Sequence, residues 1–547
     1  MPLYFDVRSY GASGNRHSYD TAAIQKAIDA AYAAGGGTVV FPAGVYPSHT
    51  LHLRSRVTLH LEAGATLLAE YPSQDGSHGY DHPEPSESGA LKYQDYGHSH
   101  FKNSLIYGEN LDNIAITGQG TIDGLALAGA HHVQLPGEEP SPFQGENHGD
   151  ISDFHDYHLG EIPGQANKAI ALKNCRNVTF RDFSLFRGGH FAFLLTGVDN
   201  LTIDNLKVDT NRDAFDIDCC RNVRMSNCSV NSPHDDAIVL KTSYALNELR
   251  PCENITITNC VVSGYSIGSM LDGTYDRSFQ KATDQDGPTG RIKIGTESNG
   301  DFRNIAITNC VFDRCRGLAL ETVDGATIED VVVSNITMRD IVNAPFFLII
   351  GNRARGPEGT PVGKLRRVSI SNINVYEADS RYASQIIGQP GHNVQDVSFD
   401  NIRIGYKGGL TMQQIADQPD DLVNAFFLRG NDEGVKGPRD PYAVPERPKA
   451  YPEPSMRGLL PAYALYCRHA ENITFRNVSV SLIEADERTA IVLDDVQGAD
   501  FHRFKLPTDN GTAICRLSDV SSFTFDQSPN LPDTSIEKTS FQVLEAE

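Results

Sequence analysis

A short pattern that returns three times between residues 177 and 225 decides the fold. The three copies are Asn177-Val178-Thr179-Phe180, Asn200-Leu201-Thr202-Ile203 and Asn222-Val223-Arg224-Met225, at intervals of 23 and 22 residues. Each copy is short, alternates in polarity and is typical of a β-strand with Asn at its corner. A period in the low twenties indicates a solenoid, whose coils stack parallel strands about 4.8 Å apart.

Related copies extend along most of the chain. They are Asn113-Ile114-Ala115-Ile116, Asn254-Ile255-Thr256-Ile257, Asn304-Ile305-Ala306-Ile307, Val368-Ser369-Ile370, Val397-Ser398-Phe399 and Asn472-Ile473-Thr474-Phe475. The leucine spacing of leucine-rich repeats is absent. We therefore predict an all-β fold, a single-stranded right-handed parallel β-helix that forms one domain over residues 1–547. Asn at the corners tolerates a left-handed backbone and can hydrogen-bond to the next coil.

The N-terminal segment has a different periodicity. Residues 20–35 have helical spacing of apolar residues, with Asp20 as the expected N-cap and glycines from Gly35 onward as the stop. We predict a helix that caps the open end of the solenoid. Three polar segments, at about 125–166, 265–290 and 415–460, are expected to be loop insertions that form walls around a cleft.

Bulk composition narrows the possible partners and compartments. The chain has 547 residues and a formal net charge of -23, which argues against nucleic acid and anionic membranes. It has no apolar run long enough to span a bilayer. No leader is visible at the start, so the protein is cytoplasmic if the sequence is complete, and periplasmic or secreted if a leader has been removed. Its ten cysteines lack metal-ligand spacing and are interpreted as small buried side chains. We expect a monomer with no cofactor.

Two acidic clusters interrupt the repeats. They are Asn211-Arg212-Asp213-Ala214-Phe215-Asp216-Ile217-Asp218 and His234-Asp235-Asp236. Asp213 and Asp235 are one repeat apart, so we expect them at equivalent positions on adjacent coils. Neighbouring like charges raise the proton affinity of one member, so that one carboxyl can be protonated while another is ionised. Asp236 joins them only if a turn or bulge breaks the strand alternation there.

Other acids are placed by the same periodicity. Glu297 is expected in nearly the same phase as Asp213, lining the same groove, while Asp216 and Asp218 are interpreted as structural. A single Asp at a solenoid corner is usually structural. Several acids in phase without basic partners are costly to bury, which favours an enzyme. A calcium site is another use of stacked carboxylates.

At these residues the chain resembles glycoside hydrolase family 28, the polygalacturonases and rhamnogalacturonan hydrolases of the pectate-lyase-like β-helix superfamily. The family motif Asn-Thr-Asp-Gly-x-Asp is similar to the stretch from Asn211 to Asp216, and its Asp-Asp pair matches Asp235-Asp236. The resemblance implies hydrolysis with inversion. Asp235 would be the general acid, and Asp213 and Asp236 would activate the water. Inverting enzymes separate acid and base by roughly 6.5–9.5 Å to admit that water.

Two family motifs are replaced in this chain. Pro288-Thr289-Gly290 stands where Gly-His-Gly is expected, and Leu318-Ala319-Leu320-Glu321 stands where Arg-Ile-Lys is expected. A substrate carboxylate would be repelled near Glu321, whereas a neutral sugar hydroxyl could bind there. Residues that could supply positive charge or sugar contacts instead are Arg291, Lys293, Lys241, Arg353, His190 and His234. Each of these also has a local structural interpretation.

Three functions are compatible with these residues. The first is a glycoside hydrolase, exo-acting because long loops block part of the groove, on pectin-derived or related plant cell-wall oligosaccharides or polysaccharides. The second is a polysaccharide lyase on a uronate-containing glycan, which would use calcium and a basic residue. The third is a non-catalytic carbohydrate-binding β-helix. The acidic cluster favours the first.

Overall fold

The computed structural model describes residues 3–85, 92–94, 96–129, 141–143, 164–282, 284–424, 438–507, 512–529 and 531–546. Much of the predicted loop 125–166 and part of the predicted loop 415–460 lie outside these ranges. The chain divides into two compact units, residues 1–279 and 280–547, which are described in turn. The predicted fold class, an all-β right-handed parallel β-helix, is confirmed. The single domain stays a prediction.

The first unit contains short strands and a few helical segments. Its elements are β1 (Tyr4–Asp6), η1 (Val7–Tyr10), α1 (Thr21–Ala33), β2 (Gly37–Phe41), β3 (Gly44–Ser48), β4 (Leu51–His52), β5 (Val57–Leu61), β6 (Ala65–Ala69), α2 (Tyr96–Ser99), β7 (Ile106–Glu109), β8 (Asp112–Gly118), β9 (Thr121–Asp123), β10 (Lys168–Lys173), β11 (Arg176–Arg181), β12 (Ser184–Phe186), β13 (Phe191–Thr196), β14 (Asp199–Asp204), β15 (Lys207–Asp209), β16 (Asp213–Asp218), β17 (Arg221–Ser226), β18 (Ser229–Asn231), β19 (Ile238–Thr242), β20 (Cys252–Thr258), β21 (Val261–Ser263) and α3 (Ser269–Asp272).

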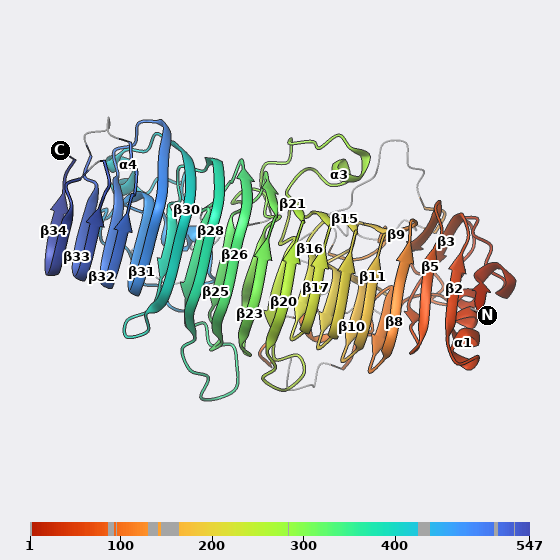
Figure 1. Cartoon of the computed structure of the whole chain (residues 1–547). Coiled ribbons are helices and arrows are strands. Elements are labelled where there is room, and N and C mark those ends of the chain that lie inside the picture. Colours follow the sequence, from red (N-terminus) through yellow and green to blue (C-terminus); the bar gives the residue numbers. More distant parts are fainter. Residues whose placement is uncertain are drawn as a thin grey trace. The chain divides into compact units, whose positions relative to one another are not determined.

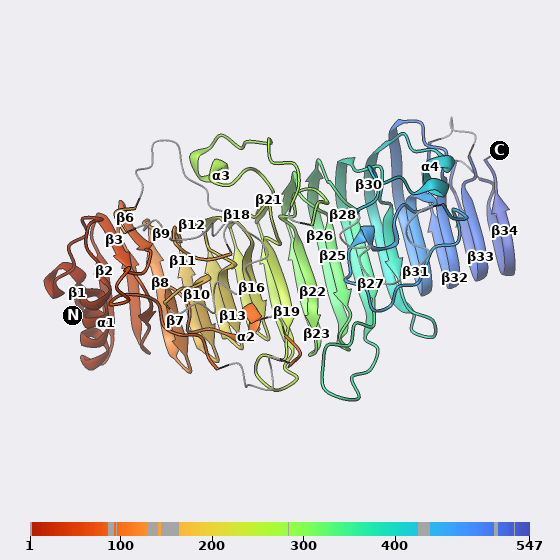
Figure 2. The same ribbon diagram turned by 180° about the vertical axis from the view of Figure 1, so that it is seen from behind.

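These strands form three parallel sheets, and each coil contributes one strand to each sheet. The first sheet contains β7, β10, β13, β16 and β19 in spatial order. The second runs β5, β8, β11, β14, β17 and β20, and the third runs β6, β9, β12, β15, β18 and β21. Figure 1 shows the second sheet as a row of parallel arrows, and Figure 2 shows the first sheet from behind. The acidic clusters precede or begin strands of the first sheet.

A ladder of Asn side chains marks one corner of successive coils between Asn113 and Asn254. Asn177, Asn200, Asn222 and Asn254 all have left-handed backbones, with φ between 55° and 58°. Each donates its side-chain N–H to the side-chain oxygen of the preceding Asn; Asn200 Nδ2, for example, lies 3.0 Å from Asn177 Oδ1. The apolar residue that follows each Asn is buried. Both predicted properties of the corner Asn are therefore confirmed.

The N-terminal helix α1 lies close to its predicted range. Its apolar face, which includes Ile24 and Ile28, is buried. The Asp20 side chain does not cap it, contrary to the sequence interpretation. Instead, this carboxylate accepts backbone N–H groups from Ser13 at 2.7 Å and Gly14 at 3.0 Å, because the preceding loop competes for its oxygens. Capping of the solenoid end by α1 stays a prediction.

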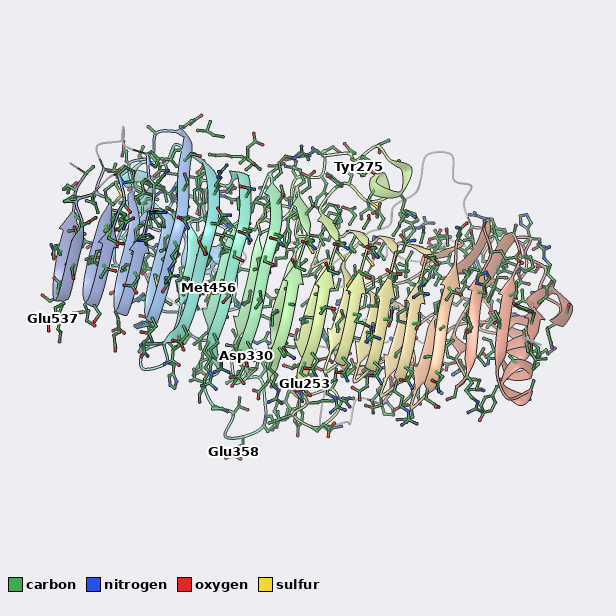
Figure 3. All side chains as sticks on the ribbon, in the orientation of Figure 1. Glu253, Tyr275, Asp330, Glu358, Met456 and Glu537 are labelled. Atoms are coloured by element: carbon green, nitrogen blue, oxygen red, sulfur yellow. The ribbon has the colours of Figure 1, made fainter. Side chains whose placement is uncertain are left out.

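A long loop carries α3 and leaves the third sheet after β21 (Figure 1). Asp209 at the end of β15 accepts the backbone N–H groups of Met270 and Leu271, at 3.0 and 3.3 Å. Tyr275, labelled in Figure 3, is 55% exposed on this loop. The loop packs Phe279 against His234, with ring centroids 4.6 Å apart. This part of the predicted insertion therefore lies beside the second acidic cluster.

The second unit has longer strands that turn corners without a break. Its elements are β22 (Ile292–Ser298), β23 (Phe302–Thr308), β24 (Val311–Asp313), β25 (Leu318–Thr322), β26 (Thr327–Arg339), β27 (Phe346–Ile350), β28 (Lys364–Ala378), β29 (Ser384–Ile387), β30 (Val394–Gly408), α4 (Met412–Asp417), η4 (Pro454–Arg457), β31 (Ala462–Glu484), β32 (Thr489–His502), β33 (Cys515–Asp526) and β34 (Thr534–Leu544). The strands are parallel up to β33, and β34 pairs with β33 in the antiparallel direction.

The cysteines agree with a further sequence interpretation. All ten cysteines are buried and free, so they are small core side chains. The helices within the described ranges are too short or too polar to span a bilayer.

Candidate active site

The structure brings Asp213, Asp235 and Asp236 together. One carboxylate oxygen from each lies within 4.8 Å of the others, although the first acid is on β16 and the other two precede β19. Parallel stacking of consecutive coils accounts for this grouping. It is tighter than the roughly 6.5–9.5 Å that separates acid from base in inverting glycosidases.

The in-phase partner of Asp213 is Asp236, which corrects the pairing expected from the 22-residue interval. Phe215 pairs with Ile238, a register of 23 residues. The Ala214 N–H donates to the Asp236 carbonyl at 3.1 Å, which continues this register to Asp213. The chain takes one more residue to round the turn at 233–234, so Asp235 falls on a bend. The predicted turn is thus present. It lets the consecutive residues Asp235 and Asp236 both approach Asp213.

The three acids differ in exposure. The Asp235 side chain is 24% exposed and that of Asp213 only 7%, and Asp236 is also buried. Burial raises the pKa of Asp213 well above its usual value, and the negative charge of Asp235 adds to the increase, while the Lys241 ammonium opposes it. Asp213 also accepts the Asp236 backbone N–H at 3.2 Å. The group thus combines one accessible carboxyl with a buried one of high proton affinity.

Arg212 holds the exposed acid. Its Nη2 lies 2.7 Å and its Nε 3.2 Å from Asp235 Oδ2. The guanidinium is itself mostly buried, so the pair is better shielded from solvent than a surface ion pair. Arg212 occupies the position of Thr in the family motif, and sequence reasoning assigned it no role. Its place directly before Asp213 in the motif was the available signal.

Lys241 lies on the other side of Asp213. Its Nζ is 3.2 Å from Asp213 Oδ2 and 3.0 Å from Asp216 Oδ2, and both carboxylates are buried. The same ammonium lies 2.7 Å from Nε2 of His98, which comes from α2. Figure 2 shows α2 beside the first sheet. Lys241 therefore contacts carboxylates of this chain, which the sequence did not predict. The role of His98 could not be predicted from the repeats either, because His98 lies outside them.

The acids around Lys241 are not arranged as a cation site. His98, Asp213 and Asp216 are close enough together to ligate a metal ion. Their nearest ligand atoms instead converge on the Lys241 ammonium, which occupies the position of a cation. These three residues therefore hold the lysine, and the calcium alternative for the stacked carboxylates Asp213, Asp235 and Asp236 stays a prediction.

The two histidines named from sequence differ in their surroundings. His190 is buried, and burial lowers its pKa well below the usual value, with Arg212 as the next cause. Its ring lies 4.3 Å from that of Phe191. His234 packs on Phe279, as described above. The structure thus places His190 near the positive groups of the site and His234 against the α3 loop.

Asp218 has structural surroundings. Its carboxylate accepts the Ser243 backbone N–H at 2.7 Å, the Ser243 hydroxyl at 2.6 Å and the Thr196 hydroxyl at 3.0 Å. These bonds join three consecutive coils of the first sheet. The structural interpretation of Asp218 agrees with them, whereas Asp216 shares Lys241 with Asp213.

The remaining candidates lie in the second unit, where they form ion pairs. Arg291 is buried and pairs with Glu453, with Nη1 3.1 Å from Oε2, and its Nη2 lies 3.7 Å from Glu321 Oε1. Arg316 also contacts Glu453, with Nη1 3.1 Å from Oε1, and its other terminal nitrogen, Nη2, donates to Asp284 Oδ1 at 2.6 Å. Sequence reasoning missed Glu453 because it lies in the 415–460 insertion, which carries no repeat.

A second group of charges surrounds Arg353. Its Nε donates to Asp324 Oδ1 at 3.0 Å, and its Nη2 lies 3.5 Å from Glu297 Oε1. Lys293 is buried within β22, whose register pairs it with Ala319 of β25. Arg291 and Arg353 therefore neutralise acids of the chain itself.

Two family models match the sequence. Residues 87–281 match the glycosyl hydrolases family 28, and residues 4–126 match the rhamnogalacturonase A/epimerase, pectate lyase-like family. Among curated proteins, an exo-poly-alpha-D-galacturonosidase of Dickeya chrysanthemi is 37% identical over 129 residues. That match covers 23% of this chain and 20% of the relative, so the chain spans about a fifth of the relative's length.

Solved structures share the fold at low identity. The family 28 exopolygalacturonase of Yersinia enterocolitica superposes with a TM-score of 0.62 at 18% identity, over 92% of this chain and 78% of that one. The exopolygalacturonase of Thermotoga maritima gives a TM-score of 0.55 at 18% identity, over 74% and 88%. The resemblance read from the acidic motifs is thereby confirmed: residues 87–281, which hold both acidic clusters, match the glycosyl hydrolases family 28.

Proposed function

We propose that the protein is a glycoside hydrolase that cleaves pectin-derived or related plant cell-wall saccharides of galacturonide or rhamnogalacturonan type. The observation that carries this proposal is the convergence of Asp213, Asp235 and Asp236 within 4.8 Å, in the segment that matches family 28. Hydrolysis of a glycosidic bond needs a proton donor and a carboxylate that activates water or attacks the sugar. This group contains carboxyls in two different environments.

Asp235 is the general acid in this proposal, and Asp213 with Asp236 forms the base. Asp235 is the most exposed of the three and can reach a glycosidic oxygen. Its proton goes to the leaving oxygen as the bond to the anomeric carbon breaks. A water attacks the opposite face and loses its proton to the base. Arg212 favours the ionised form of Asp235, whereas burial favours the protonated form of Asp213, so the pH profile of kcat/KM is the measurement that tests this division of roles.

Inversion and exo action are the finer parts of the proposal. Inversion follows from the family resemblance. Because the carboxylates lie closer together than is usual in inverting enzymes, the anomeric configuration of the product is the decisive measurement. Exo action is supported by the names of the Dickeya, Yersinia and Thermotoga proteins and by the α3 loop beside Asp235. Polygalacturonate, digalacturonate and rhamnogalacturonan oligosaccharides are the substrates to try first.

The test compares the wild type with Asp213→Asn, Asp235→Asn and Asp236→Asn on this panel. We expect each substitution to lower kcat by about 10²–10⁴-fold, the contribution of general acid or base catalysis. Asp29→Asn on α1 is the matched control, since Asp29 pairs with Arg54 in another part of the unit. Retained activity in both Asp213→Asn and Asp235→Asn would refute the assignment.

Product analysis separates the alternatives. Proton NMR of the first product gives its anomeric configuration, and chain-length analysis shows whether units leave from one end. A product that absorbs in the ultraviolet, together with chelator sensitivity, would indicate a lyase. Binding without turnover, unchanged by Asp235→Asn, would indicate a non-catalytic carbohydrate-binding protein.

A further inference from the structure

The Lys241 ammonium has an acceptor for each of its three N–H donors. His98 Nε2 lies at 2.7 Å, Asp216 Oδ2 at 3.0 Å and Asp213 Oδ2 at 3.2 Å. An ammonium carries three donors and no acceptor, so this set satisfies it completely. Such satisfaction matters because Lys241 is buried and an isolated charge there would be very costly.

This arrangement indicates the role of one His98 ring nitrogen. An ammonium has no acceptor, so Nε2 takes the acceptor role in its 2.7 Å contact with Lys241 Nζ. Nε2 also lies 3.1 Å from Asp216 Oδ2, and the two acceptors face the same ammonium from adjacent positions. Phe191 supports the arrangement, since its ring meets the imidazole edge-on at 4.9 Å and lies 5.7 Å from the ammonium. The imidazole thus contacts both an aromatic ring and the lysine.

We propose that His98 is a positioning residue of the candidate site: it accepts one N–H of Lys241 and so holds the ammonium against Asp213 and Asp216. His98 belongs to α2, a four-residue turn outside the repeats. A segment more than one hundred residues before the acids in sequence therefore controls the charge beside them. The catalytic consequence rests on the proposed function, whereas the control of Lys241 does not.

The expected consequence is electrostatic. The charged and titratable groups around Asp213 are Lys241, Asp216, Asp235, Asp236, Arg212, His98 and His190. Lys241 is the cation in direct contact with Asp213, and it opposes the rise in pKa that burial and Asp235 produce. Without His98, the flexible lysine stem can move its charge away. Asp213 then keeps its proton to higher pH.

The test uses the full chain and three variants. His98→Ala removes the acceptor, His98→Gln replaces it with an amide oxygen that can also accept from an ammonium, and Lys241→Met removes the donor. His52→Ala is the matched control, because His52 pairs with Asp81 at 2.9 Å in the same unit without touching the acids. In the profile of kcat/KM against pH, one limb is set by the ionisation of Asp213. We expect His98→Ala to shift this limb to higher pH by about one unit.

Further readouts separate positioning from simple damage. We expect His98→Ala to lower kcat about tenfold with little change in KM. His98→Gln should retain most of the wild-type kcat. Added to Lys241→Met, His98→Ala should cause no further loss of kcat. A uniform loss of kcat at every pH, or full additivity of the two substitutions, would overturn the proposal.

A stability measurement tests the proposal without turnover. The pKa of Asp213 in the folded protein is raised, so its contribution to stability is lost as pH increases. Raising that pKa further by His98→Ala must therefore lower Tm more at pH 8 than at pH 4. Equal losses at both pH values would contradict control of Lys241 by His98. If the wild type cleaves no pectic substrate, the proposed function fails while this comparison still decides the role of His98.

Discussion

Arg212 and Asp235, on successive coils, form an ion pair in which Arg212 Nη2 lies 2.7 Å from Asp235 Oδ2. The acid proposed to donate a proton is therefore held by a cation that disfavours its protonated form. Arg212 also replaces the Thr of the family motif. The pair is thus a charge interaction at the site that the motif alone does not provide.

Arg212→Thr should move the pH optimum to higher pH. Loss of the guanidinium makes Asp235 easier to protonate, so the basic limb of kcat/KM should rise by about one pH unit. Arg212→Lys keeps the charge but not the two-point contact, and should fall between the variant and the wild type. Initial rates between pH 3 and pH 9 check this. An unchanged basic limb in Arg212→Thr would argue against Asp235 as the proton donor.

Asp213 and Asp218 lie on the same strand and should respond differently to the same substitution. Asp213→Asn should lower kcat by about 10²–10⁴-fold with little change in the far-ultraviolet spectrum. Asp218→Asn loses charge-assisted bonds to Ser243 and Thr196, and should cost about 1.5–3 kcal/mol of stability for each bond lost. Urea unfolding measures that cost. Where the variant is folded, its kcat should stay within a few-fold of wild type.

Asp209 should make the stability of the first unit depend on pH. Burial raises its pKa to about 6, although Asn231 and the α3 loop donate hydrogen bonds to it. A raised folded-state pKa means that stability is present below the unfolded value and is lost as pH rises through about 6. Asp209→Asn removes this loss. Relative to wild type, the variant should gain up to about 3 kcal/mol between pH 4 and pH 7. A constant difference in unfolding free energy across that range would contradict the shift.

Arg291 should be essential to the second unit. Arg291→Met removes a cation that neutralises the buried Glu453 and Glu321. The free energy of unfolding should therefore fall by about 3–5 kcal/mol. The matched control is Arg366→Met, because Arg366 pairs with Glu329 near the surface and should contribute below about 1 kcal/mol. Denaturant unfolding compares the two. Adding Glu453→Gln to Arg291→Met should recover part of the loss, and similar costs for the two single variants would argue against the buried network.

The cysteines should be inert in the folded protein. All ten are free and buried, and burial raises the pKa of Cys467 and Cys515 well above the usual value. A colourless disulfide reagent that releases a coloured thiolate should therefore react only after denaturation, and then with ten thiols. Reducing agent should leave Tm unchanged. Fast reaction of the native protein, or fewer than ten thiols after unfolding, would contradict this.

The repeat phase was sufficient to predict the strands and the grouping of the acids. Asn177, Asn200 and Asn222 lead strands of one sheet because a coil of nearly constant length returns each corner to the same place. Asp213 and Asp236 followed because they share that phase, and Asp235 is brought to them by the turn before β19. The error of one residue, which made Asp235 and not Asp236 the partner of Asp213, came from a turn whose length the strand pattern does not encode.

Residues outside the repeats could not be placed from sequence. His98 and Glu453 lie in segments with no period, so their contacts depend on how a loop folds back on the coils. The role of Arg291 and Arg353 was open for the same reason. Their charge suggested a binding surface for uronates, but their partners, Glu453 and Asp324, are visible only in three dimensions. Periodicity therefore predicts which residues of successive coils are neighbours. It does not predict which residues of an insertion contact them.

The antiparallel pairing of β34 with β33 affects whether copies of the protein can associate through this end of the strand stack. A stack of parallel strands ends in a template onto which a further strand of any chain could add in the same sense. Here an oppositely directed ribbon is paired along β33, and charged side chains such as Glu537 and Lys538 lie along it. Growth into fibres by end-to-end addition at β33 is thereby obstructed, and a truncation before residue 534 should make the protein prone to self-assembly.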